Sequence, residues 1–184
     1  MNLIDIKSPA DLKGLSISEL TDLTAQARQA LMTKVSEHGG HFGPPMGVAE
    51  MIMALHYVFN SPVDKIVYDV SHQSYVHKMV TGRALAFLDH DHYDDVTGYT
   101  DPTESEHDFF NIGHTSTSIS LASGLATARN LKGDSENIIA IIGDGSLSGG
   151  EAFEGLDYAA TLDSNMIIIV NDNDQSIAEN HGGL

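Results

Sequence analysis

Two apolar runs that each lead into polar residues constrain the fold of this chain more than any other feature of its sequence. Residues 138–142 are Ile-Ile-Ala-Ile-Ile and lead into Gly-Asp-Gly at 143–145, and residues 166–170 are Met-Ile-Ile-Ile-Val and lead into Asn-Asp-Asn at 171–173. Apolar runs without alternation are typical of parallel strands that helices cover on both faces. Residues 151–162 carry a helical apolar stripe between the two runs. The segment is therefore predicted to be a β-α-β unit.

The right-handed crossover of such a unit brings both strand ends to one edge of the sheet, where α/β folds bind ligands. Asp144 would repel a diphosphate at this edge unless a cation lay between them. Mg²⁺ prefers oxygen ligands from a few protein groups, phosphates and water. We therefore predict that Asp144 and an Asn side chain of residues 171–173 bind a magnesium ion that holds a phosphate group.

Loops of this composition also occur in dinucleotide-binding turns and in purely structural turns. A dinucleotide-binding turn would need a third glycine or alanine where this chain has Ser148, and it carries no acid in the turn. A purely structural role remains open, because Gly, Asn and Asp favour turns in any protein.

The composition excludes several classes of function. With 184 residues, of which 41% are hydrophobic, the chain can bury one core, and a formal charge of −17 disfavours nucleic acid and anionic membranes as partners. The chain has no cysteine, no signal-like N-terminus and no apolar run of about 18 residues. We expect a protein of the cytoplasm that binds neither nucleic acid nor membrane. Because the chain ends just after the predicted metal loop, we also expect it to be part of a longer protein.

Outside the β-α-β unit, the sequence predicts one domain without repeats. A capping-box pattern at residues 16–19 begins a helix that the glycines at 39–40 end. The remaining predicted elements are a loop at 41–47, a helix at 48–59, a strand at 65–70, a long surface loop at 89–108 and a small-residue helix at 115–131.

Three of the ten histidines stand at predicted loops beside strand or helix ends, namely His41, His72 and His114. A pKa near neutrality lets imidazole accept and donate protons, so these three are candidates for a site. The others are expected to be structural or solvated: His56 packed within a helix, and His38, His107 and His181 solvated. His90 and His92 form at most a weak metal pattern.

Several longer stretches resemble the N-terminal part of the 1-deoxy-D-xylulose-5-phosphate synthases, which are transketolase-like thiamine diphosphate enzymes. The spacing of Asp144 and Asn173 resembles the metal motif of thiamine diphosphate enzymes. The more specific stretches are Gly-Gly-His-Phe at 39–42, Asp-Val-Ser-His-Gln-Ser-Tyr at 69–75 with His-Lys at 77–78, Thr-Gly-Arg at 81–83, and Gly-His-Thr-Ser-Thr-Ser-Ile-Ser at 113–120.

The resemblance implies an α/β fold in which a parallel sheet has helices on both faces, as in the thiamine diphosphate-binding fold, here incomplete. Residues 1–184 would form a truncated diphosphate-binding domain, without the pyrimidine-binding and C-terminal domains. It also implies a homodimer that condenses pyruvate with glyceraldehyde 3-phosphate, with loss of carbon dioxide, to make a precursor of isoprenoids and thiamine.

Carried over position by position, the resemblance implies roles for named residues. His41 matches a histidine that transfers protons on the bound substrate. Asp144, Asn173 and the main-chain carbonyl of Gln175 would bind Mg²⁺. The expected contacts with thiamine diphosphate are His72, Gly113, His114, Thr115, Gly145, Ser146 and Asn173.

Two loops depart from the family pattern. Residues 43–47, Gly-Pro-Pro-Met-Gly, resemble transketolase instead, and Tyr-Thr-Asp-Pro at 99–102 replaces the usual Pro-x-Arg. Transketolase, or its split N-terminal subunit, is therefore an alternative, and a non-catalytic binding module is another. Because the activating glutamate of these enzymes lies on the pyrimidine-binding domain, residues 1–184 alone are predicted to be inactive.

Overall fold

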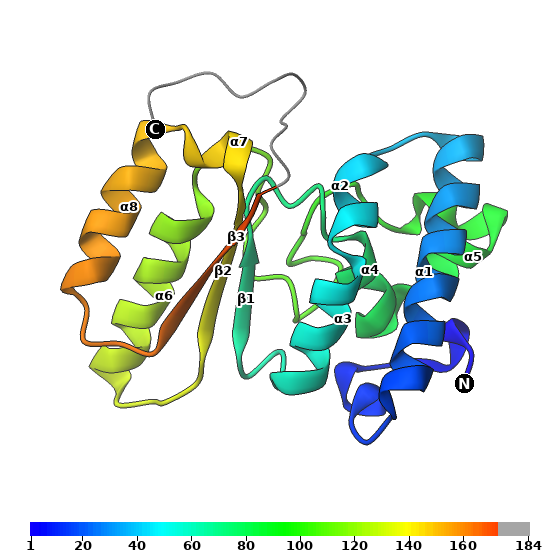
Figure 1. The fold of residues 1–184 in the computed structure, drawn as a ribbon, viewed down its shortest axis with the longest axis horizontal. Helices are drawn as coiled ribbons and strands as arrows, with labels where there is room; N and C mark the ends of the chain where they lie inside the picture. The colour runs from blue at the N-terminus through cyan, green and yellow to red at the C-terminus, as the bar shows by residue number, and fades with distance from the viewer. Residues whose placement is uncertain (173–184) are drawn as a thin grey trace.

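The structure is a computed structural model that describes residues 1–172. Its centre is a parallel sheet of β1 (Lys65–Tyr68), β2 (Ile138–Gly143) and β3 (Met166–Asn171), in the order β1-β2-β3 (Figure 1). Helix α8 (Gly150–Thr161) connects β2 to β3, which confirms the predicted β-α-β unit.

The other helices come before β2 in the chain, except for α7, which directly follows β2. They are η1 (Leu3–Asp5), η2 (Pro9–Leu12), α1 (Ile17–His38), α2 (Gly43–Gly47), α3 (Ala49–Val58), α4 (Tyr75–Lys78), η3 (Met79–Arg83), α5 (Leu85–Leu88), η4 (His90–Asp95), α6 (Ser118–Lys132) and α7 (Asp144–Leu147). No helix within residues 1–172 is both long enough and apolar enough to cross a membrane.

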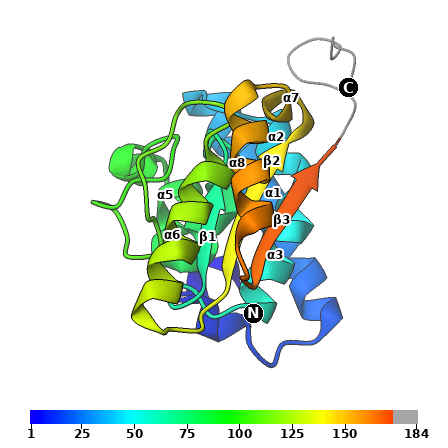
Figure 2. The same cartoon turned by 90° about the vertical axis from the view of Figure 1, so that its left-hand side faces the viewer.

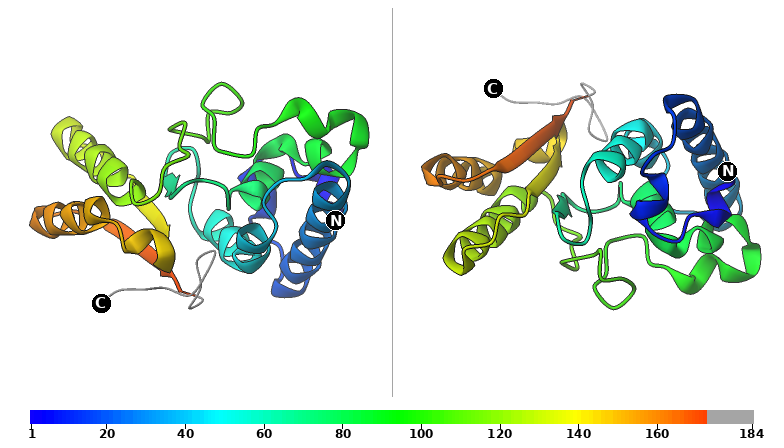
Figure 3. Two further views of the ribbon diagram at one scale, coloured as in Figure 1. Left: turned by 90° about the horizontal axis from the view of Figure 1, so that it is seen from above. Right: turned by 90° about the horizontal axis from the view of Figure 1, so that it is seen from below.

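Helices cover both faces of the sheet, as predicted. Helices α6 and α8 lie on one side, and α1, α3, α4 and α5 lie on the other (Figure 3). Side chains of β2 alternate between the two layers: Ile139 and Ile141 join the core around α1 and α3, whereas Ile138, Ala140 and Ile142 join the core around α6 and α8. The alternation explains why an uninterrupted apolar run is needed in this strand.

Strand β3 departs from the expectation of two buried faces. It pairs with β2 along its whole length, but it forms an edge of the described sheet (Figure 2). Ile167 and Val170 are accordingly 36% and 47% exposed. An apolar run thus predicts a strand but does not give its position in the sheet.

The predicted limits of the first long helix are correct. Ser16 precedes α1, its hydroxyl accepts a hydrogen bond from the Glu19 amide at 3.3 Å, and the Glu19 carboxylate accepts one from the Ser16 amide at 2.8 Å. These reciprocal bonds satisfy amides that have no partner within the helix. Gly39 ends the helix with a φ of +86°, a conformation that glycine adopts without strain.

Two predicted loops are wrong. Residues 43–47 form the short helix α2, whose first turn contains prolines, as helix starts tolerate. Residues 89–108 include η4 and are not a surface loop, because Tyr93, Thr100, His107 and Asp108 are buried.

Ion pairs hold this segment against the core. Arg83 donates to both carboxylate oxygens of Asp108, at 2.7 and 2.9 Å, and to Glu104 at 3.0 Å. Lys78 also donates to Glu104, at 2.5 Å. The side chains of Asp108 and Lys78 are fully buried. These charged side chains can be buried because each is paired with an opposite charge.

Two buried histidines extend this network. His77 Nε2 lies 2.7 Å from an Asp108 oxygen, and His77 Nδ1 lies 2.8 Å from His56 Nε2. Burial lowers the pKa of His77 to about 4, against the opposing effect of Asp108. Neutral His77 therefore donates through Nε2 and accepts the His56 N–H at Nδ1. Burial also lowers the pKa of His56, which is packed as predicted.

Candidate functional site

The predicted site residues follow the carboxyl ends of the parallel strands. Residues 69–72 follow β1, and Asp144 begins α7 directly after β2. Gly143 pairs with Asn171 in the sheet register, so the ends of β2 and β3 lie side by side (Figure 1). The prediction that these strand exits share one edge is confirmed.

Asp69 joins this edge to a distant part of the sequence. It is 1% exposed, and its two carboxylate oxygens accept hydrogen bonds from the amides of Ser116 and Ser118, each at 2.9 Å. Ser116 has a φ of +72°, an uncommon conformation for a residue with a side chain. Asp69 therefore holds the Gly-His-Thr-Ser stretch at the end of β1 and fixes the start of α6.

The same stretch also contacts the loop after β2. The Ser116 hydroxyl donates to the Ser146 carbonyl at 2.6 Å. Gly149 lies so close that a Cβ added to it would stand 2.8 Å from the Cβ of Ser116. The structure thus brings together two segments that the sequence assigned to cofactor binding, around residues 113–116 and 144–149.

His41 and His72 lie close to each other at this edge. Their ring centroids are 5.2 Å apart and the rings stand edge to face. Burial lowers the pKa of both, and the neighbouring charge of His41 lowers the pKa of His72 further. Both imidazoles are therefore neutral at neutral pH and can accept a proton.

One buried atom of His72 is left without a partner. Among residues 1–172, no group makes a hydrogen bond to His72 Nδ1. Buried polar atoms are rarely unpaired in native proteins, except where a ligand or water supplies the partner. His72 Nδ1 therefore offers a hydrogen-bonding position to a polar ligand at this edge of the sheet.

Two tyrosines contact the His41 ring, and the sequence analysis assigned a role to neither of them. The ring centroids of Tyr99 and Tyr75 lie 5.4 and 6.3 Å from that of His41. Tyr75 belongs to a stretch that carried the family resemblance, whereas Tyr99 belongs to a departing loop. No local pattern in the sequence marks either tyrosine as a neighbour of His41.

The third candidate histidine behaves differently. His114 is exposed, and its Nδ1 donates to the Thr115 carbonyl at 2.7 Å. It makes no ring contact with His41 or His72 within residues 1–172. Gly113 and Thr115 are likewise exposed, so this stretch is free to meet a ligand.

The prediction that His107 is solvated is wrong. It is only 8% exposed, and Ser61 Oγ lies 2.8 Å from its Nδ1. His38 and His92, in contrast, form partly exposed pairs with Asp94 and Asp95.

The magnesium ligands are only partly described. Asp144 lies at the sheet edge, but Asn173 and Gln175 fall outside the described residues, so the ligand set stays a prediction. Within residues 1–172, no group of three or more His, Asp or Glu side chains could hold a metal ion, and this includes the segment with His90 and His92.

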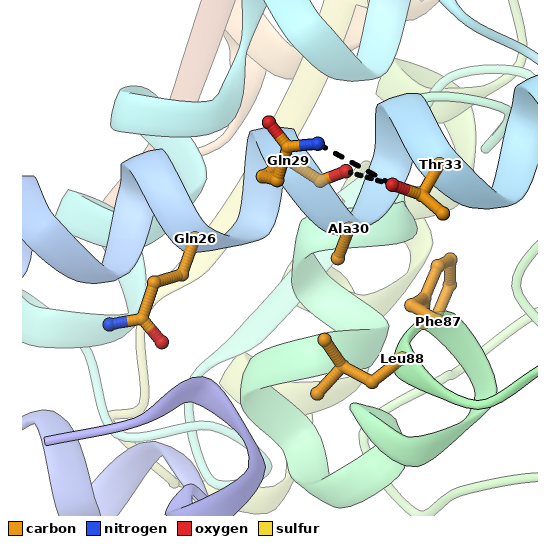
Figure 4. A pocket seen from close by; sticks show the side chains of 6 residues that line it. All are labelled: Gln26, Gln29, Ala30, Thr33, Phe87 and Leu88. Atoms are coloured by element: carbon orange, nitrogen blue, oxygen red, sulfur yellow. Dashed lines mark hydrogen bonds between the residues drawn. The ribbon is translucent and has the colours of Figure 1, made fainter.

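Surface hollows lie both near the candidate site and away from it. One of about 290 Å³ lies between α1 and α5, away from the strand ends, and is lined by Gln26, Gln29, Ala30, Thr33, Phe87 and Leu88 (Figure 4). A second hollow, of about 230 Å³, is lined by His41, Tyr75 and Gly98, among others, and adjoins the candidate site.

Comparison with known proteins gives a consistent result. The sequence pattern of a family described as "1-deoxy-D-xylulose-5-phosphate synthase" matches residues 3–184. Similar proteins with that name come from Symbiobacterium thermophilum, 50% identical over the whole chain, and from Caldanaerobacter subterraneus subsp. tengcongensis, 51% identical over 99% of it. The chain spans only 28% and 29% of the length of these two relatives.

Proposed function

Because the chain belongs to the 1-deoxy-D-xylulose-5-phosphate synthase family, we propose that it is the diphosphate-binding N-terminal part of such an enzyme. The complete enzyme would condense pyruvate with glyceraldehyde 3-phosphate and release carbon dioxide. The observation that carries the proposal is that His72 and the loop after β2 both follow the carboxyl ends of neighbouring parallel strands, with the His41 ring 5.2 Å from that of His72. The match to the synthase pattern favours this enzyme over transketolase, despite the altered loop at 43–47.

We propose thiamine diphosphate and Mg²⁺ as the cofactors. The residues present fit this group, because His72 offers a buried nitrogen that has no partner among residues 1–172 and Asp144 offers a carboxylate beside small residues. Asp144, Asn173 and the Gln175 carbonyl would bind the metal. The proposed cofactor contacts are His72, Gly113, His114, Thr115, Gly145, Ser146 and Asn173. When bound, the cofactor supplies the electron sink that the loss of carbon dioxide requires.

His41 is proposed to move protons on the bound substrate. Its lowered pKa keeps the imidazole neutral, so one ring nitrogen carries a proton that it can donate while the other carries none. The ring is partly exposed, so a substrate can reach it. The non-catalytic alternative differs here, because it expects no loss of activity in any assembly when His41 is changed.

Changing Asp144 to alanine tests the cofactor proposal. We expect the affinity for thiamine diphosphate in the presence of Mg²⁺ to fall by about 100-fold or more, because the anionic metal ligand is lost beside a diphosphate. Isothermal titration calorimetry on the enzyme with its remaining domains measures this. The exposed Asp157, on α8, provides the control as Asp157→Ala, which should bind normally. Equal affinity of Asp144→Ala and the control would reject the metal assignment.

Residues 1–184 alone are proposed to be inactive. The glutamate that activates the cofactor would lie on the pyrimidine-binding domain of the complete enzyme. An assay of carbon dioxide release from pyruvate should therefore detect no turnover by the isolated chain, and turnover comparable to a full-length relative would contradict the proposal. The homodimer and the cytoplasmic location stay predictions.

A further inference from the structure

We infer that Tyr75 is a positioning residue that determines which ring nitrogen of His41 carries the proton. This inference rests on the proposed role of His41 in proton transfer. It concerns the hydroxyl group of a tyrosine that is only 5% exposed, whereas the His41 ring is partly exposed. Tyr75 would therefore act through His41 and not on the substrate.

The hydroxyl group of Tyr75 makes two polar contacts with His41. Its oxygen accepts the main-chain N–H of His41 at 3.3 Å and lies 3.5 Å from His41 Nδ1. Tyr75 is 5% exposed, and within residues 1–172 its hydroxyl makes no other hydrogen bond. His41 Nδ1 is therefore the acceptor available to the Tyr75 O–H.

This arrangement selects one tautomer of the neutral ring. When Nδ1 accepts a hydrogen bond, the proton of a neutral imidazole resides on Nε2. The Nε2–H group of His41 then points away from Tyr75 and is available as a donor. A hydrogen bond to Nδ1 also stabilises the neutral ring relative to the charged one, and so it lowers the pKa of His41 in the same direction as burial.

The surroundings of the hydroxyl group are built for this contact. A Cβ added to Gly40 would stand 2.9 Å from Tyr75 Oη, and Gly40 has a φ of +124° that favours glycine. A Cβ added to Gly98 would stand 3.3 Å from the same oxygen and 3.8 Å from His41 Nδ1. The Tyr75 ring also packs against Phe87, with centroids 5.4 Å apart. Two separate chain segments therefore leave room for the tyrosine hydroxyl and hold it beside His41.

The test compares Tyr75→Phe with the unchanged chain, by nitrogen NMR of histidine-labelled protein. His41→Gln identifies the signals of His41 among those of the ten histidines. We expect the Nε2–H tautomer of His41 to predominate in the unchanged chain. In Tyr75→Phe we expect a mixture of tautomers and a pKa of His41 raised by about 0.5–1, which corresponds to the loss of one hydrogen bond.

Tyr99→Phe is the matched control, because the Tyr99 ring also contacts His41 while its hydroxyl makes no hydrogen bond within residues 1–172. It should leave the tautomer of His41 unchanged. Gly98→Ala provides a second variant, since the added Cβ crowds the hydroxyl and should also shift the tautomer ratio. If Tyr75→Phe and Tyr99→Phe give the same tautomer and pKa as the unchanged chain, or if the unchanged chain holds its proton on Nδ1, the inference is wrong.

Activity of the complete enzyme separates this inference from the proposed function. If both hold, Tyr75→Phe shifts the acid limb of the pH profile of kcat/KM toward higher pH, in step with the pKa of His41. If Tyr75→Phe changes the NMR spectrum but His41→Gln leaves activity intact, the contact between Tyr75 and His41 stands and the proposed role of His41 fails.

Discussion

Replacement of Asp108 by alanine is expected to lower the free energy of unfolding of the chain by about 3–5 kcal/mol, because it leaves buried groups without their partner. The Asp108 carboxylate is fully buried and accepts hydrogen bonds from Arg83 and His77, and also from the Asp101 amide at 2.9 Å. Without it, the guanidinium of Arg83 faces a single carboxylate, that of Glu104. Equilibrium unfolding in urea measures the loss.

The pH dependence of this loss follows from the pKa of Asp108. Burial by itself would raise the pKa, but hydrogen bonds from Arg83 and His77 outweigh it and hold the pKa well below its ordinary value. A carboxyl group with a depressed pKa stabilises the fold above the pKa of the unfolded chain, near 3.9 for Asp. The difference between the unchanged chain and Asp108→Ala should therefore be constant from about pH 5 to pH 8 and shrink as the pH falls below about 4.

Glu106→Ala serves as the control for Asp108→Ala, because Glu106 belongs to the same segment but is exposed. We expect it to leave the urea midpoint nearly unchanged, as for most surface substitutions. Equal midpoints for the two variants would show that the buried network does not stabilise the fold.

Replacement of Asp69 by alanine is expected to lower the free energy of unfolding by about 3 kcal/mol. The change leaves the buried amides of Ser116 and Ser118 without acceptors, and each lost acceptor costs about 1–3 kcal/mol. It also releases the uncommon backbone conformation of Ser116. The free energy of unfolding of Asp69→Asn should lie between those of the unchanged chain and Asp69→Ala, because the side-chain amide keeps only one acceptor oxygen.

Hydrogen exchange distinguishes a local from a global effect of Asp69→Ala. Exchange of the amides in residues 113–120 should become faster than in the unchanged chain, even under conditions where the sheet remains protected. The exposed residue Asp134 provides the control as Asp134→Ala. Unchanged protection of residues 113–120 in Asp69→Ala would contradict the proposed anchoring role.

The sequence identified the candidate site better than it identified the core. His41, His72 and Asp144 could be found because each stands just after a predicted helix or strand, and parallel strands bring such positions to one edge. The burial of His77 and His107 could not be predicted in the same way. Their burial depends on Asp108 and Ser61, and no local pattern links these residues.

Residues 89–108 illustrate the same limit. An acidic segment without periodicity predicts a solvated loop, yet the structure buries Asp108 and part of Glu104 against Arg83 and Lys78. Polar composition predicts exposure only when the charges have no partners inside the protein.

The sequence by itself determined the strands β2 and β3, the crossover helix between them and the limits of α1, because periodicity and capping act between residues that are close in the chain. Only the tertiary structure decided that β3 forms an edge of the described sheet, that Asp69 holds the distant stretch at 113–118, and that Tyr75 contacts His41. These contacts join segments tens of residues apart, and their geometry arises from the packing of helices and strands against one another.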